Sequence, residues 1–125
     1  MRTVLVLAAL VLAAAALATP AAAADACFRT RDMNGHRKVD NHTIYVRVMI
    51  KDIYRITSSA ACFAGSTNSD ALIVKTVGSS GLVCTPIDLD LAVKTGPVGT
   101  SHCIVDSITK LTPQEAAAIP KKLRP

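Results

Sequence analysis

The chain has 125 residues, with 14 Lys and Arg against 9 Asp and Glu, a formal net charge of +5, and no Trp. This length is typical of one domain. The basic residues are scattered, and only Lys121, Lys122 and Arg124 cluster, at the C-terminus. Scattered charge is typical of a solvated surface, so we expect no nucleic-acid partner.

The N-terminus is typical of an export signal. Arg2 precedes an uncharged apolar run, and Pro20 and small residues follow it. This order predicts a signal peptide over residues 1–24 and a mature domain over 25–125. A helix retained in the membrane is disfavoured, because the run is mostly Ala and contains a Pro. We therefore expect a periplasmic or secreted protein with no stable membrane anchor after cleavage.

The mature chain has an even number of cysteines, Cys27, Cys62, Cys84 and Cys103, and no Cys-x-x-Cys motif. In an oxidising compartment this pattern predicts two disulfides, and it supports neither a redox site nor a zinc ribbon. A lipid on Cys27 is disfavoured because the acidic Asp25 lies where small residues are usual.

The first half of the domain has a strong strand pattern. Residues 27–33 are expected to form a first strand, and residues 34–41 a connection with Asn34-Gly35 as its turn. "TIYVRVMI" alternates with a period of two, and "IYRITS" follows after a short turn. Residues 43–58 are therefore predicted to form a hairpin.

Three more strands are expected in the second half, over residues 71–77, 82–94 and 101–111, separated by Gly-rich turns. The middle one contains Pro86, which marks an edge or a break. Its alternation predicts inward side chains at Ile87, Leu89, Leu91 and Val93 and outward side chains at Asp88, Asp90 and Lys94.

The pattern changes near the C-terminus. Thr112, Pro113 and Glu115 lie at the N-cap, N1 and N3 positions of a helix with a capping box. A short helix over about 113–119 is therefore predicted, followed by a flexible basic tail over 120–125.

Together these elements predict a mainly β fold. We expect a small antiparallel sandwich or barrel of about six strands with a short C-terminal helix, stapled by disulfides. If the strands form a simple meander, the cysteines sort into the pairs Cys27–Cys84 and Cys62–Cys103. Four cysteines allow three connectivities, so the pairing depends on that assumption.

The chain offers few candidates for catalysis. Asp88 and Asp90 share one face of an expected strand, which is most simply a solvent face. His36, His42 and His102 have no ligand spacing, and the first two are expected in solvated loops. We predict no catalytic residue, no metal and no cofactor.

The best candidates for ligand contact are aromatic and basic side chains on the hairpin. Tyr45 with Arg47, and Tyr54 with Arg55, could form a mixed patch on its exposed face. Cross-strand packing explains these residues equally well.

One ordered set of segments carries a resemblance: Cys27, "TIYVRV", "YRIT", Cys62, "GLVC" and "CIVDSITKLTPQEAAA". It resembles a family of small exported proteins of Gram-negative bacteria that is classed as a domain of unknown function. The resemblance covers nearly the whole mature chain, although family members often have an aromatic residue near His36. It implies no activity and no functional residue.

The sequence favours an exported, non-enzymatic β-domain that binds or supports another component of the cell envelope, either a protein or a ligand, and acts as a monomer. Two alternatives stay open. One is an inhibitor of lytic enzymes, by analogy with other small disulfide-stapled β-domains. The other is a small hydrolase that uses Asp88 and Asp90 or the histidines.

Overall fold

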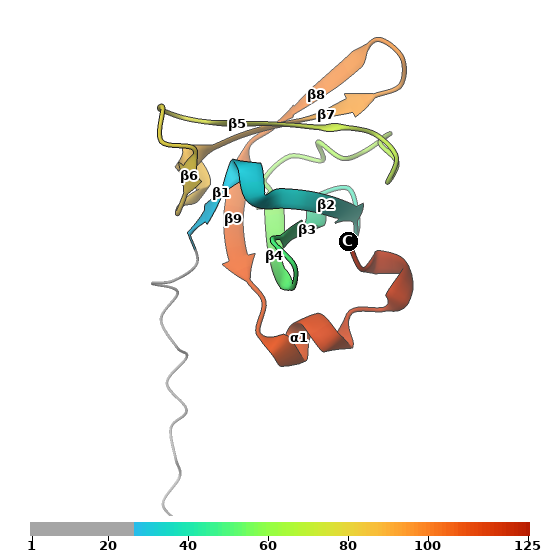
Figure 1. Ribbon diagram of the computed structural model, residues 1–125. Coiled ribbons are helices and arrows are strands. Elements are labelled where there is room, and N and C mark those ends of the chain that lie inside the picture. The colour runs from blue at the N-terminus through green and yellow to red at the C-terminus, as the bar shows by residue number, and fades with distance from the viewer. Residues whose placement is uncertain (1–26) are drawn as a thin grey trace, which may run out of the picture.

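The computed structural model describes residues 27–125, in which nine strands form three antiparallel sheets beside one short α-helix (Figure 1). The mainly β, antiparallel fold class is confirmed. The signal peptide predicted over residues 1–24 lies outside the described residues. Within residues 27–125, no helix has both the length and the apolar character needed to cross a membrane.

The largest sheet has four strands in the order β2-β3-β4-β9. They span Met33–Lys38 (β2), Thr43–Val48 (β3), Asp52–Ser58 (β4) and Val105–Lys110 (β9). The predicted hairpin corresponds to β3 and β4, which are joined by a turn that contains Met49 with a positive φ of 55°. Every second residue of β3 is buried, as its alternation predicts.

A second sheet has three strands in the order β5-β7-β8. They span Leu72–Thr76 (β5), Leu89–Thr95 (β7) and Gly99–Cys103 (β8). In Figure 1 this sheet crosses above the four-stranded one, and β5 runs over β2. The inward side of β7 is formed by Leu89, Leu91 and Val93, as expected.

The expected strand over residues 27–33 and the expected connection over 34–41 are both wrong. Phe28–Arg29 (β1) pairs with Leu82–Val83 (β6), and Thr30–Asp32 then form a 3-10 turn, η1. Residues 33–38 form β2, an edge strand of the large sheet. Asn34-Gly35 forms a β-bulge there rather than a turn. Met33 and Gly35 pair with the consecutive residues Val48 and Arg47 of β3, so β2 holds one extra residue and the chain continues in the same direction.

The predicted inward position of Ile87 is also wrong, because this side chain is 80% exposed. Pro86–Asp88 form a 3-10 turn, η2, which starts at the proline. Proline fixes φ and lacks an N–H, so the ladder and its alternation begin only at Leu89.

The last expected strand, over residues 101–111, is divided at Ile104. β8 belongs to the three-stranded sheet and β9 to the four-stranded sheet, so the chain crosses between the sheets at this residue. Ile104 itself is 70% exposed. The simple meander is therefore wrong. This crossing, the separation of β6 from β7 and the additional strand β2 raise the strand count from about six to nine.

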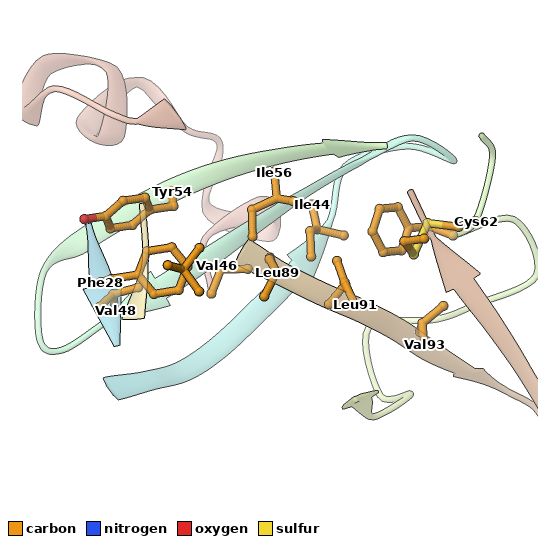
Figure 2. Packing of buried hydrophobic residues seen from close by; sticks show 13 residues of the cluster. Phe28, Ile44, Val46, Val48, Tyr54, Ile56, Cys62, Leu89, Leu91 and Val93 are labelled. Atoms are coloured by element: carbon orange, nitrogen blue, oxygen red, sulfur yellow. A yellow bond between two sulfur atoms is a disulfide. The ribbon is translucent and has the colours of Figure 1, made fainter. Parts of the chain in front are cut away.

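The inner faces of the two larger sheets form one core (Figure 2). Leu89, Leu91 and Val93 of β7 face the β3–β4 hairpin in that view. Phe28 joins the same core, with its ring centroid 4.7 Å from that of Tyr54. The largest fully buried side chains are Tyr54, Phe63, Ile44, Ile56, Leu91, Val46, Val83 and Val93.

Two disulfides tie outlying segments to this core. Cys27 bonds to Cys84, which joins the start of β1 to the end of β6, and Cys62 bonds to Cys103, which joins the loop after β4 to the end of β8. These are the two pairs that the meander favoured, although the strands do not form that meander. The pairing of β1 with β6 brings Cys27 and Cys84 together. Cys62 and Cys103 meet at another corner, where the Ser59 N–H donates to the Ile104 carbonyl.

The helix α1 spans Pro113–Ala118 and has the expected capping box. The Thr112 N–H donates to Glu115 Oε2 at 2.8 Å, and the Glu115 N–H donates to Thr112 Oγ1 at 3.2 Å. Residues 121–123 form a 3-10 turn, η3. Arg47 Nη1 donates to the carbonyl oxygen of Pro125 at 2.9 Å, so the segment expected to be a flexible tail contacts the large sheet.

The two disulfides differ in burial, which predicts different contributions to stability. Cys62 and Cys103 are buried in the core, whereas Cys27 and Cys84 are exposed. The bridged residues are 57 and 41 positions apart, so by the chain-entropy model each bridge stabilises the fold by about 4 kcal/mol. Changing Cys62 and Cys103 together to Ala should lower the free energy of unfolding more than changing Cys27 and Cys84, because it also leaves a cavity. Urea unfolding measures the free energy of unfolding of each double variant, and an equal decrease in the two variants would contradict this expectation.

Candidate functional site

The hairpin residues predicted to contact a ligand do not form one patch. Tyr45 and Arg55 are cross-strand partners on the outer face of β3 and β4, and Arg47 lies on that face two residues along β3. Tyr54 lies on the opposite face, because it pairs with the buried Val46. Three of the four residues therefore share a surface, and the fourth belongs to the core.

Tyr54 is only 2% exposed, so its expected role in an exposed patch is wrong. Burial raises the pKa of its hydroxyl, with a smaller opposing effect from the charge of Lys110. Adjacent residues of a strand point to opposite faces, so Tyr54 and Arg55 could not share a surface.

Arg47 is engaged within the molecule. Its Nε donates to Asn34 Oδ1 at 2.8 Å, and its Nη1 donates to the Pro125 carbonyl. The guanidinium therefore joins the bulge of β2 to the C-terminus. Binding of a ligand to this part of the hairpin would have to replace these contacts.

Asp88 and Asp90 do not form an acid/base pair. Asp88 Oδ2 accepts hydrogen bonds from the N–H of Cys84 at 3.0 Å and from the N–H and hydroxyl of Thr85 at 2.8 and 3.0 Å. These bonds, that from Cys84 first, lower the pKa of the Asp88 carboxyl. Asp90 is an exposed residue of β7 opposite Lys75. Asp88 is therefore a cap of η2 and not half of a catalytic dyad.

The three histidines lie apart, and residues 27–125 contain no group of three His, Cys, Asp or Glu side chains that could hold a metal ion. His42 is exposed, with its Nδ1 3.2 Å from the carbonyl oxygen of Ser58. His102 is exposed on β8, beside the buried Cys103. The expectation that His36 lies in a solvated loop is wrong, because it belongs to β2 and is partly buried.

A hollow lies between the hairpin turn and α1. This groove, with a volume of about 670 Å³, is bordered by Lys51 and by Asp52 and Lys110, which belong to the neighbouring strands β4 and β9. Its apolar part is formed by Leu111, Pro113 and Ala116. We call it the α1 groove.

The capping box and one backbone hydrogen bond hold α1 beside the α1 groove. The Leu111 N–H donates to the Ile53 carbonyl at 2.8 Å, which holds the chain against β4 just before the helix begins. Thr112 and Glu115 then start α1, so that Ala116 faces the groove. Ala has a small side chain, and the space therefore stays open.

An ion pair lies at one side of the α1 groove. Lys110 Nζ donates to Asp52 Oδ2 at 2.9 Å, and both side chains are about one-third exposed. The same two residues border a second hollow of about 250 Å³, which is also lined by Phe28, Met49 and Tyr54. The pair thus separates two adjoining hollows and offers a donor and an acceptor to a ligand in either.

Sequence reasoning did not find this site. Asp52 and Lys110 are 58 residues apart, and only the pairing of β4 with β9 brings them together. The one local sequence feature was the capping box, which predicted the helix but not the surface against which it lies.

The chain matches a family of unknown function, DUF6491, over residues 1–125. It belongs to this family. No curated protein and no solved structure gives a significant match. The match confirms membership of a family of unknown function, as the resemblance implied, and it assigns no activity to the α1 groove.

The cap formed by Asp88 predicts a pH dependence of stability. Its pKa is lower in the folded than in the unfolded chain, so the stabilisation is present above the unfolded pKa and is lost as the pH falls through the folded pKa. Asp88→Asn should therefore reduce stability at pH 7 and have less effect as the pH falls below about 4. Urea unfolding between pH 2 and 7 measures this difference, with Asp90→Asn as the control. A difference that stays constant over this range would contradict the assignment.

Proposed function

We propose that this member of the family is an exported, non-enzymatic domain that binds a component of the bacterial cell envelope in the α1 groove. The observation that carries the proposal is the groove itself, an open hollow of about 670 Å³ with an apolar wall and a single ion pair. Ligand sites in proteins commonly have this size and this mixture of apolar surface and few polar groups.

Export is supported by the cysteines. Both disulfides link segments that are distant in the sequence, and the described residues contain no free cysteine. Disulfides of this structural kind persist in oxidising compartments. The N-terminal sequence pattern supports the same location.

The hydrogen bonds that the polar groups already make within the protein favour binding over catalysis. Asp52 and Lys110 bond to each other in the groove, and Asp88 accepts three hydrogen bonds through its Oδ2 in a separate turn. A general base needs a carboxylate or imidazole within reach of a nucleophile or of the substrate proton. The groove instead offers apolar area and two opposite charges, which suits recognition of a ligand with an apolar body and a polar head.

A bulky side chain in the groove tests the proposal. Ala116→Phe should fill the space between α1 and the hairpin and abolish capture of the bound component from envelope extract. The matched control is Ala118→Phe, because Ala118 is an exposed residue on another side of the same helix. The measurement is quantitative capture by the three full-length proteins, each produced with both disulfides formed.

The expected outcome is a set of envelope components that the unchanged protein and Ala118→Phe retain and that Ala116→Phe loses. Equal capture by Ala116→Phe and Ala118→Phe would place binding elsewhere on the molecule. Capture no greater than that of a bare matrix would remove the binding function altogether. A thermal melt of each variant checks that its fold is retained.

A further inference from the structure

We propose that the turn between β3 and β4, residues 49–51, binds the surface of a lipid bilayer with anionic headgroups by inserting the side chains of Met49 and Ile50. These two residues are large and apolar, and they are 59% and 89% exposed. In Figure 1 the turn lies at the lower end of the large sheet, on the side where α1 lies. The proposal does not depend on a ligand in the α1 groove.

The backbone of this turn is held by the segment that begins β2. Met49 has a positive φ of 55°, in the left-handed region that residues other than Gly seldom occupy. Its N–H donates to the Asp32 carbonyl at 2.8 Å, and its carbonyl accepts a hydrogen bond from Asn34 Nδ2. Both backbone polar groups of Met49 are therefore fixed, while its side chain stays exposed.

The fold does not require apolar residues in this turn. Turns usually contain Gly, Asn, Asp or Ser, and Gly fills a left-handed position without strain. Neither Met49 nor Ile50 belongs to the core cluster of buried residues. Strained backbone persists where the surrounding structure holds it, and it is found most often at functional sites. Exposed apolar side chains on a turn that is held in this way indicate contact with an apolar surface.

The apolar surface extends from the turn into the second hollow. Met49 lines this hollow together with Leu82 of β6, which is 39% exposed. Cys27 lines it as well, and the sequence before Cys27 contains the uncharged apolar run that ends at Leu17. The chain between Leu17 and Cys27 can span at most about 35 Å. A bilayer that takes up the apolar run therefore lies within reach of this side of the domain.

Positive charge surrounds the apolar residues and selects the kind of surface. The charged side chains of the turn, of the second hollow and of their ion pairs are Arg29, Arg31, Lys51 and Lys110, with Asp32 and Asp52. Each of the two acidic residues lies in an ion pair with one basic residue, so the basic residues are in excess. Apolar side chains that enter a bilayer, beside basic ones that meet anionic headgroups, are the usual combination in proteins that bind membrane surfaces.

A single tryptophan tests the insertion, because the chain contains no Trp. Ile50→Trp places an indole in the turn, and Val98→Trp places one in the β7–β8 turn, where Val98 is 98% exposed. Each full-length variant is mixed with vesicles of phosphatidylcholine and phosphatidylglycerol, and with vesicles of phosphatidylcholine alone. The emission of Ile50→Trp should move to shorter wavelength on the anionic vesicles, and that of Val98→Trp should not. The comparison is independent of other lipid contacts, because both variants have the same N-terminal residues.

The role of charge is tested in the Ile50→Trp protein. Adding Lys51→Gln should raise the concentration of anionic lipid needed for half of the emission change about fivefold, because it removes one positive charge at the surface. The matched control is Lys94→Gln, a change at an exposed lysine of β7, which should leave this concentration unchanged.

The unchanged protein is measured as well, because Trp itself favours membrane interfaces. Anionic bicelles that carry a paramagnetic headgroup should broaden the methyl NMR signal of Ile50 far more than that of Ile104, which is 70% exposed at the other end of the large sheet. Equal broadening of the two signals, equal emission changes in the two Trp variants, or equal changes on neutral and anionic vesicles would each overturn the proposal. So would the absence of any change at residue 50.

Discussion

The bond between Cys62 and Cys103 lies at the place where the chain passes from one sheet to the other. Cys103 is the last residue of β8, and β9 begins two residues later in the four-stranded sheet. Cys62 follows β4, which is the partner of β9, and the Ser59 N–H donates to the Ile104 carbonyl at this same corner. The disulfide therefore fixes the loop after β4 to the corner from which β9 starts. The disulfide and this hydrogen bond therefore hold the two sheets together at the corner where the chain passes between them.

With the sheets held together in this way, the alternating apolar residues of β3, β4 and β7 fill the core between them. Hollows lie around this core. Two of them are the α1 groove, at the end of β4 and β9, and the cavity between the edge strands β2 and β5. The edge of β2 is partly covered by the loop after β4, since Lys38 Nζ donates to the Ser66 carbonyl and the Lys38 N–H donates to Asn68 Oδ1. Such cover protects an edge strand from pairing with another chain.

Local patterns predicted the elements that local physics determines. The period of two over β3 and β7 and the capping box at Thr112 identified a hairpin, an inward face and a helix start. The differences between prediction and structure have a long-range and a local cause. Asn34-Gly35 is a strong turn pattern, yet pairing with β3 makes it a bulge. Ile87 continues the alternation in the sequence, but the neighbouring Pro86 starts a 3-10 turn that interrupts it. The ion pair in the α1 groove depends on strand partners far apart in the sequence, which no local pattern specifies. Alternation alone places Tyr54 opposite Arg55, so the inward orientation of Tyr54 follows from the sequence.

Two unfavourable features of the structure coincide at His36. The bulge interrupts the ladder of an edge strand, and the ring nitrogen beside it is buried without a partner, a situation that typically costs about 1–3 kcal/mol. A regular strand would avoid both, because it would turn either Met33 or His36 away from the interior. Sequences that fold well keep such departures where function requires them, and β-bulges often lie beside sites where a side chain must be re-aimed. The register shift therefore turns both Met33 and His36 toward the interior and places this ring nitrogen among buried groups.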